Sequence, residues 1–208
     1  MTLETGQARL IDRREAIRRV SALLGGVALV GGSALLTASE REQPRAAAAR
    51  AGVGRFTAQD IGFLDEVAET ILPETKTPGA KAAQVGAFMA LMVNETYDER
   101  DQRVFRDGMG KLDEACRTMH SAAFMEATPP QRLAVLEQLD REQKAYMDAR
   151  EAADAPAHYF RMMKQLALLG YFTSEIGCTQ AMRYVEAPGH FAPCVPYTPG
   201  EATWAAHA

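Results

Sequence analysis

The residue types that usually carry out chemistry are scarce in this sequence, and they do not cluster. The chain has four isolated histidines: His120, His158, His190 and His207. No Cys-x-x-Cys-His, paired Cys-x-x-Cys, His-Glu-x-x-His or Glu-x-x-His motif occurs, so covalent haem, zinc, iron–sulfur and di-iron sites are not indicated. His120 is expected to close a helix, and His158 is expected to be solvated in the first turn of another. The sequence therefore predicts no catalytic, cofactor-binding or metal-binding residues in this chain.

The chain has three cysteines, an odd number that leaves at least one thiol outside any pairing within the chain. Cys116 falls on an apolar helical stripe and is predicted to lie in the core. Cys194 lies between two prolines in an extended segment, where an exposed thiol would pair in an oxidising compartment. Cys178 is its most plausible partner within the chain. A bridge from Cys194 to another subunit and three buried thiols are the alternatives.

The charge is distributed unevenly along the 208 residues. The first fifty hold eight Lys and Arg against five Asp and Glu, a net charge of +3, and the rest carry −7. The overall charge of −4 gives no indication of nucleic-acid binding. A basic N-terminal segment followed by an acidic remainder of the chain is typical of an export signal joined to a folded domain.

The N-terminal segment has its regions in the order that an export signal requires. Arg13 and Arg14 precede an uncharged, glycine-rich run over residues 20–39, and an alanine cluster follows at residues 46–49. This order resembles a twin-arginine signal, cut after Ala48 or Ala49, which would carry a folded protein to the periplasm. The run is also long enough to cross a bilayer, so a retained membrane anchor is the alternative. We therefore expect a signal segment at 1–49 and a domain at 50–208.

The domain is predicted to be all-α, a single core of about six helices. Apolar residues recur at three-four spacing, and Thr57 and Thr128 each begin a capping pattern. Helices are expected over residues 57–72, 80–94, 98–120, 156–169 and 173–184, and Gly170 is expected to stop the helix over 156–169. A further helix is expected to begin at residue 128, with Leu133, Leu136, Leu139 and Tyr146 on its buried stripe.

The last segment, residues 185–208, is rich in proline and glycine and carries aromatic residues. A proline-stiffened arm loses little entropy on ordering, and aromatic side chains are common interface anchors. This C-terminal arm is therefore expected either to wrap on a partner or to pack back on its own helices.

Two stretches carry a family resemblance. The segment Ile-Leu-Pro-Glu-Thr-Lys-Thr-Pro-Gly-Ala at 71–80 resembles the corresponding motif of the gluconate 2-dehydrogenase subunit 3 family. Leu-Gly-Tyr-Phe-Thr-Ser-Glu-Ile-Gly at 169–177, followed by Arg183-Tyr184, Pro188-Gly189 and Cys194-Val195-Pro196-Tyr197, is similar to its C-terminal signature. Together with the double-arginine leader, the resemblance spans nearly the whole chain.

The resemblance implies a non-catalytic small subunit of a membrane-associated flavin dehydrogenase that oxidises a sugar or sugar acid. FAD would lie in the flavoprotein large subunit, and haem c in a multihaem cytochrome c subunit. The large subunit would travel on this chain's leader through the twin-arginine translocase, and the complex would sit in the periplasm at the inner membrane. The expected contact residues are Thr77, Pro78, Gly79, Tyr171, Phe172, Glu175, Tyr197 and Trp204. The rival interpretation is a stand-alone exported oxidoreductase or binding protein.

Overall fold

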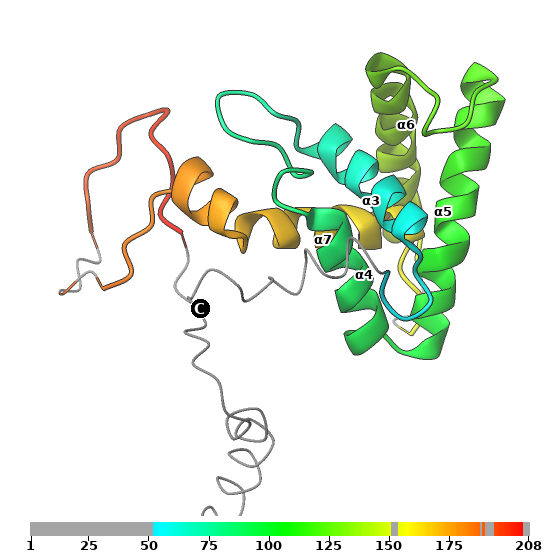
Figure 1. Cartoon of the computed structure of the whole chain (residues 1–208), viewed down its shortest axis with the longest axis horizontal. Coiled ribbons are helices and arrows are strands. Elements are labelled where there is room, and N and C mark those ends of the chain that lie inside the picture. Colours follow the sequence, from blue (N-terminus) through cyan, green and yellow to red (C-terminus); the bar gives the residue numbers. More distant parts are fainter. Residues whose placement is uncertain (1–51, 151–153, 188, 190–193, 206–208) are drawn as a thin grey trace, which may run out of the picture. The chain divides into compact units, whose positions relative to one another are not determined.

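The computed structural model describes residues 52–150, 154–187, 189 and 194–205. In chain order their helices are α3 (Ala58–Ile71), α4 (Val85–Thr96), α5 (Glu99–His120), α6 (Pro129–Asp148), α7 (Tyr159–Phe172) and the π-helix η2 (Gly177–Ala181) (Figure 1). No strand occurs in these residues, which confirms the all-α prediction. None of their helices is both long and apolar enough to cross a membrane. The predicted signal segment at 1–49 lies outside the described residues.

Local capping fixes where three helices begin. Thr57 and Asp60 form a reciprocal capping box at α3, and Thr128 and Gln131 form another at α6. Asp98 accepts a hydrogen bond from the backbone N–H of residue 101 at the start of α5. Each cap satisfies backbone donors that the first helical turn leaves unpaired, so the sequence alone specifies these boundaries.

Helix α7 is the centre of the core. It contacts α3, α4, α5 and α6, and Figure 1 shows it lying across the other helices. Its inner face buries Phe160, Met163, Leu166 and Ala167 almost completely. A helix that is apolar over much of its surface is stable when it is covered on several sides, which explains the central position of α7.

Helix α4 begins at Val85, five residues later than the sequence pattern predicts. Gln84 adopts a left-handed conformation with φ of 53°, which interrupts the helix, and its side chain makes no cap. The carboxylate of Asp65 on α3 supplies the missing acceptor, at 2.7 Å from the backbone nitrogen of Gly86. The start of α4 is therefore stabilised by a side chain from the neighbouring helix.

Three other expectations were wrong. Gly170 does not stop α7, which continues to Phe172; a Cβ at Gly170 would lie 2.6 Å from Cδ1 of Phe88, so this glycine permits close packing. Leu133 and Tyr146, both expected on the buried stripe of α6, are 47% and 41% exposed, whereas Val135 is buried. The helix expected over 173–184 is confined to the short π-helix η2, preceded by a turn.

The half-buried carboxyl of Asp65 makes stability depend on pH. Burial raises the pKa of Asp65 to about 6 from a usual 3.8, and the hydrogen bond from Gly86 opposes the shift only partly. Because the folded state holds the proton more tightly, this group's contribution is fully present below pH 4 and is lost as the pH rises through 6. Asp65→Asn keeps an acceptor for Gly86 and removes the charge.

We expect the free energy of unfolding of Asp65→Asn to equal that of the wild type near pH 4. At pH 7.5 it should be higher than that of the wild type by about 1 kcal/mol, after allowance for partial solvent screening. Urea unfolding of both proteins at the two pH values measures this. Comparing the two proteins at each pH cancels the pH-dependent contribution of other carboxyl groups to stability. One of these is Asp140, whose pKa is lowered by its hydrogen bond from Lys164. An equal difference at both pH values would contradict the prediction.

Candidate functional site

The loop after α3, residues 73–79, is clamped to the helix that precedes it. One carboxylate oxygen of Glu69 accepts a hydrogen bond from the backbone nitrogen of Glu74 at 2.9 Å, and the other accepts from that of Lys81 at 2.8 Å. Gly79 lies directly against this carboxylate, and a Cβ there would overlap both oxygens. One carboxyl side chain thus fixes both ends of a loop whose residues 73–76 are exposed.

A second clamp comes from α7. The hydroxyl of Tyr171 donates a hydrogen bond to the carbonyl oxygen of Pro78 at 2.7 Å, although 93 residues separate the two. Figure 1 shows the 73–79 loop and the C-terminal end of α7 on the same side of the helices. The loop is therefore presented in a fixed position beside the end of α7.

Gly79→Ala tests the first clamp. The added methyl group would displace the Glu69 carboxylate and break its two backbone hydrogen bonds. We expect amide exchange at Glu74 and Lys81 to become about tenfold faster, equivalent to about 1.4 kcal/mol, with little change in global stability. Gly110→Ala on α5 is the matched control, because a Cβ there meets nothing within 4 Å. Unchanged exchange in Gly79→Ala would show that Glu69 does not hold the loop.

The end of the C-terminal arm packs back on the chain at Arg183. The backbone nitrogen of Arg183 donates to the carbonyl of Thr203, and that of Ala205 donates to the carbonyl of Arg183, each at 2.8 Å. The Arg183 guanidinium lies 4.5 Å from the centre of the Trp204 ring and 3.3 Å from the Glu201 carboxylate. We call this arrangement the clasp. It favours packing of the arm's end on its own chain, one of the two expectations for this segment.

Exposed apolar side chains nevertheless gather in the last part of the chain. Twelve large apolar side chains are exposed among the described residues, and eight of these follow residue 167. We use the name C-terminal patch for these eight residues, grouped by their position in the sequence: Leu168, Leu169, Phe172, Tyr184, Val185, Val195, Tyr197 and Trp204. Tyr197 is 68% exposed and Trp204 is 52% exposed despite its contact with Arg183. Exposed aromatic side chains held in an ordered segment are typical of interaction surfaces.

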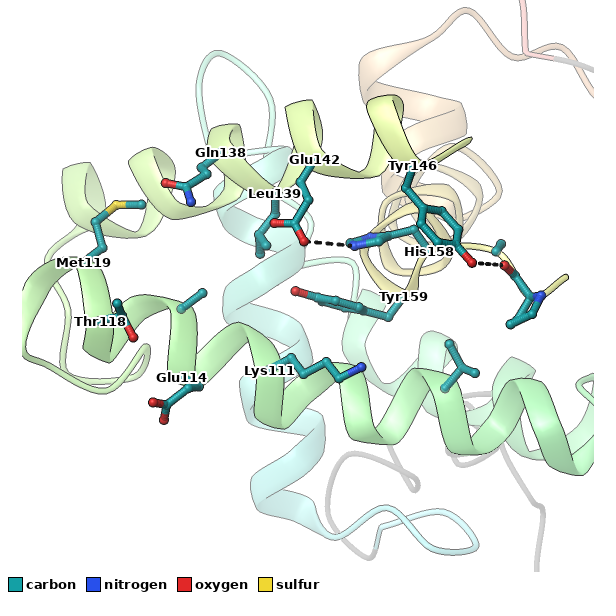
Figure 2. Close-up of a pocket in the computed structure, with 14 residues that line it drawn as sticks. Lys111, Glu114, Thr118, Met119, Gln138, Leu139, Glu142, Tyr146, His158 and Tyr159 are labelled. Atoms are coloured by element: carbon teal, nitrogen blue, oxygen red, sulfur yellow. Dashed lines mark hydrogen bonds and ion pairs between the residues drawn. The ribbon is translucent and has the colours of Figure 1, made fainter. Parts of the chain in front are cut away.

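A second feature is a cleft of about 660 Å³ between α5 and α6, closed at one end by the start of α7 (Figure 2). Lys111, Glu114 and Thr118 come from α5, and Gln138 and Glu142 come from α6. These positions recur at three-four spacing, so each set lies on one helix face. The two faces enclose a polar-rimmed cleft, which we call the α5/α6 cleft.

His158 is partly buried at the end of this cleft, so the expectation that it is solvated was wrong. Its side chain is 10% exposed and caps α7, with Nδ1 accepting from the backbone nitrogen of Phe160 at 3.2 Å. Burial lowers the pKa of His158, although the carboxylate of Glu142 lies 3.6 Å from Nε2 and opposes the shift. The imidazole is therefore neutral at pH 7. In the described part of the chain, no three His, Cys, Asp or Glu side chains are placed to hold a metal ion.

Comparison with models of protein families shows which family this chain belongs to. The family model described as gluconate 2-dehydrogenase subunit 3 matches residues 58–189, which is more than half of the sequence. This chain belongs to the gluconate 2-dehydrogenase subunit 3 family. It is thus related to a subunit of a dehydrogenase complex. No curated protein and no solved structure matches it significantly.

Within this family member, the predicted contact residues divide by burial. Tyr171 and Gly79 are buried and hold the 73–79 loop, and Thr77 and Pro78 are partly buried within it. Phe172, Glu175, Tyr197 and Trp204 are exposed. The structure brings Pro78 and Tyr171 together directly. The buried residues therefore shape the surface, and the exposed ones are free to contact a partner.

The three cysteines of the family member are free thiols in the structure. Cys116 is buried, as predicted, and burial raises the pKa of its thiol. Cys178 donates a weak hydrogen bond to the carbonyl oxygen of Phe172 at 3.3 Å, and Cys194 is exposed. The pair expected between Cys178 and Cys194 is not formed here, so an exposed thiol stands in the arm.

Sequence reasoning missed the residues that hold the surface in place. Glu69, Arg183 and Arg132 act across elements, and no local pattern marks Glu69 or Arg132. Arg132 donates to Glu66 at 2.5 Å and to the carbonyls of Phe124 and Met125 at 2.9 and 2.8 Å, which ties α6 to α3 and to the preceding loop. The Arg183-Tyr184 pair of the family signature was a usable signal for the clasp.

Proposed function

We propose that this chain is the non-catalytic small subunit of a periplasmic FAD-dependent dehydrogenase complex that oxidises a sugar or sugar acid of the gluconate type. It binds the flavoprotein large subunit, assists its maturation and carries it through the twin-arginine translocase. FAD resides in the large subunit, and a multihaem cytochrome c subunit accepts the electrons. Family membership supports assembly with a dehydrogenase, and the C-terminal patch is the observation that supports binding as the chain's own activity.

The physical basis of the proposed binding is a preformed surface. The 73–79 loop is held by Glu69 and Tyr171, and the arm is held by the clasp at Arg183. A partner that docks on ordered apolar side chains loses less conformational entropy than one that must first order them. The chain thus contributes surface and transport to the complex, while the bond chemistry takes place on the flavin of the large subunit.

Co-expression with a flavoprotein dehydrogenase subunit encoded beside this chain tests the proposal. We expect the two chains to co-purify from the periplasm as a stable complex, and the flavoprotein to stay in the cytoplasm when residues 1–49 are removed or when Arg13 and Arg14 are replaced by lysine. A monomeric small chain that never co-purifies with a flavoprotein would exclude the proposal. Turnover of a sugar by the purified chain alone would favour the stand-alone oxidoreductase instead.

A further inference from the structure

The α5/α6 cleft contains a polar group that the fold itself does not satisfy. Tyr159 is 8% exposed as a whole residue, and its hydroxyl makes no hydrogen bond within the described part of the chain. The hydroxyl oxygen is not among the fully buried unpaired atoms there, so it borders the open cleft. Figure 2 shows this hydroxyl pointing into the cleft between α5 and α6. Burial raises the pKa of Tyr159 to about 12, and the nearby charge of Glu142 adds to the shift, so the group stays a neutral phenol. A hydroxyl that the fold leaves unpaired on the wall of a cleft can exchange water for a ligand.

The charged groups around this hydroxyl favour a cation. Glu142 lines the cleft from α6 and its charge acts on the Tyr159 hydroxyl, whereas Glu114 lines the cleft from α5 with its carboxylate turned away from that hydroxyl (Figure 2). The ammonium group of Lys111 lies 5.9 Å from the centre of the Tyr159 ring. His158 adds no positive charge, because its Nδ1 accepts a hydrogen bond and leaves a neutral ring. The lining thus carries one negative charge in excess, and an anionic ligand beside the hydroxyl would meet the Glu142 carboxylate.

The floor of the cleft suits a hydrocarbon stem. It includes the apolar side chains Val104, Ala115, Met119 and Leu139, with Tyr146 at the rim. The cleft volume of about 660 Å³ lies in the range of small-molecule sites. A flexible cationic side chain commonly places its methylene groups on apolar surface and its charge beside polar groups.

We propose that the α5/α6 cleft binds an aliphatic cation, a guanidinium or ammonium group on a hydrocarbon stem. The cation lies between the carboxylate of Glu142 and the hydroxyl oxygen of Tyr159, which accepts a hydrogen bond from it. The stem lies on Leu139 and Ala115. This chemistry is shared by a free amine and by an arginine or lysine side chain of another protein, and the experiment below separates the two sources.

Titration of the full, isotope-labelled chain with N-acetyl-arginine methylamide tests the site by NMR. We expect saturable shifts in the amides of α5, α6 and the start of α7, with a dissociation constant of about 1 mM. Glu142→Gln should weaken binding about tenfold, and Tyr159→Phe about threefold. Glu137→Gln is the matched control, because Glu137 lies on α6 but lines a different groove. It should leave binding unchanged.

The outcomes are distinct. If sodium gluconate binds as well as the arginine derivative, or if Glu137→Gln weakens binding as much as Glu142→Gln, the proposal is overturned. It also fails if no saturable shift appears. If Glu142→Gln additionally weakens assembly with the dehydrogenase subunit, the bound cation is a side chain of that subunit. Unchanged assembly excludes a side chain of that subunit as the source of the cation. The titration uses this chain alone, so its result is independent of the proposed function.

Discussion

Tyr197→Ala is expected to weaken the complex with the dehydrogenase subunit about 30-fold, equivalent to about 2 kcal/mol. Tyr197 is 68% exposed, so its loss should not change the fold. Large aromatic side chains dominate many interfaces because they bury much area and lose few rotamers on binding. Affinity measured on purified subunits gives the ratio of dissociation constants directly, and thermal unfolding checks that the variant is intact.

The matched control for this prediction is Leu133→Ala. Leu133 is also exposed and apolar, at 47%, but it lies on α6 and outside the C-terminal patch. We expect its replacement to change affinity less than threefold. Trp204→Ala should resemble Tyr197→Ala, with an added effect from loss of the clasp to Arg183. If Leu133→Ala weakens the complex as much as Tyr197→Ala, the dehydrogenase docks elsewhere on this chain.

Gly86→Ala is expected to lower the free energy of unfolding by about 3 kcal/mol, in spite of the better helix propensity of alanine. A Cβ at this position would lie 2.5 Å from the carbonyl oxygen of Ile61 and 2.6 Å from the backbone nitrogen of Asp65. Both atoms belong to the backbone of α3, so they cannot rotate away as a flexible side chain could. The two helices would have to separate, and the hydrogen bond from Gly86 to Asp65 would lengthen.

Gly62→Ala on α3 is the control for this effect. Nothing lies within 4 Å of a Cβ at Gly62, so the substitution should add about 0.5–1 kcal/mol of stability through helix propensity alone. Denaturant unfolding of both variants should therefore give changes of opposite sign. Destabilisation by both would mean that the close approach of α3 and α4 at Gly86 does not cause the loss.

Local physics explains what the sequence determined. Capping boxes act within three residues, so Thr57 and Thr128 mark helix starts wherever the helices pack. The apolar stripes identify Ile61, Leu64 and Leu136 as core residues because helix periodicity alone brings them to one face. The family motifs were recognisable as continuous strings, and the matching family model confirms that resemblance.

The tertiary structure alone decided the contacts that join distant segments. Asp65 caps a helix 21 residues away, and Tyr171 fastens a loop 93 residues away. Leu133 is exposed and Val135 is buried because burial on α6 depends on where α3, α5 and α7 lie. The unsatisfied hydroxyl of Tyr159 and the clasp at Arg183 likewise arise from packing. Hydrogen bonds and desolvation depend on which groups meet in space, and periodicity along one helix does not contain that information.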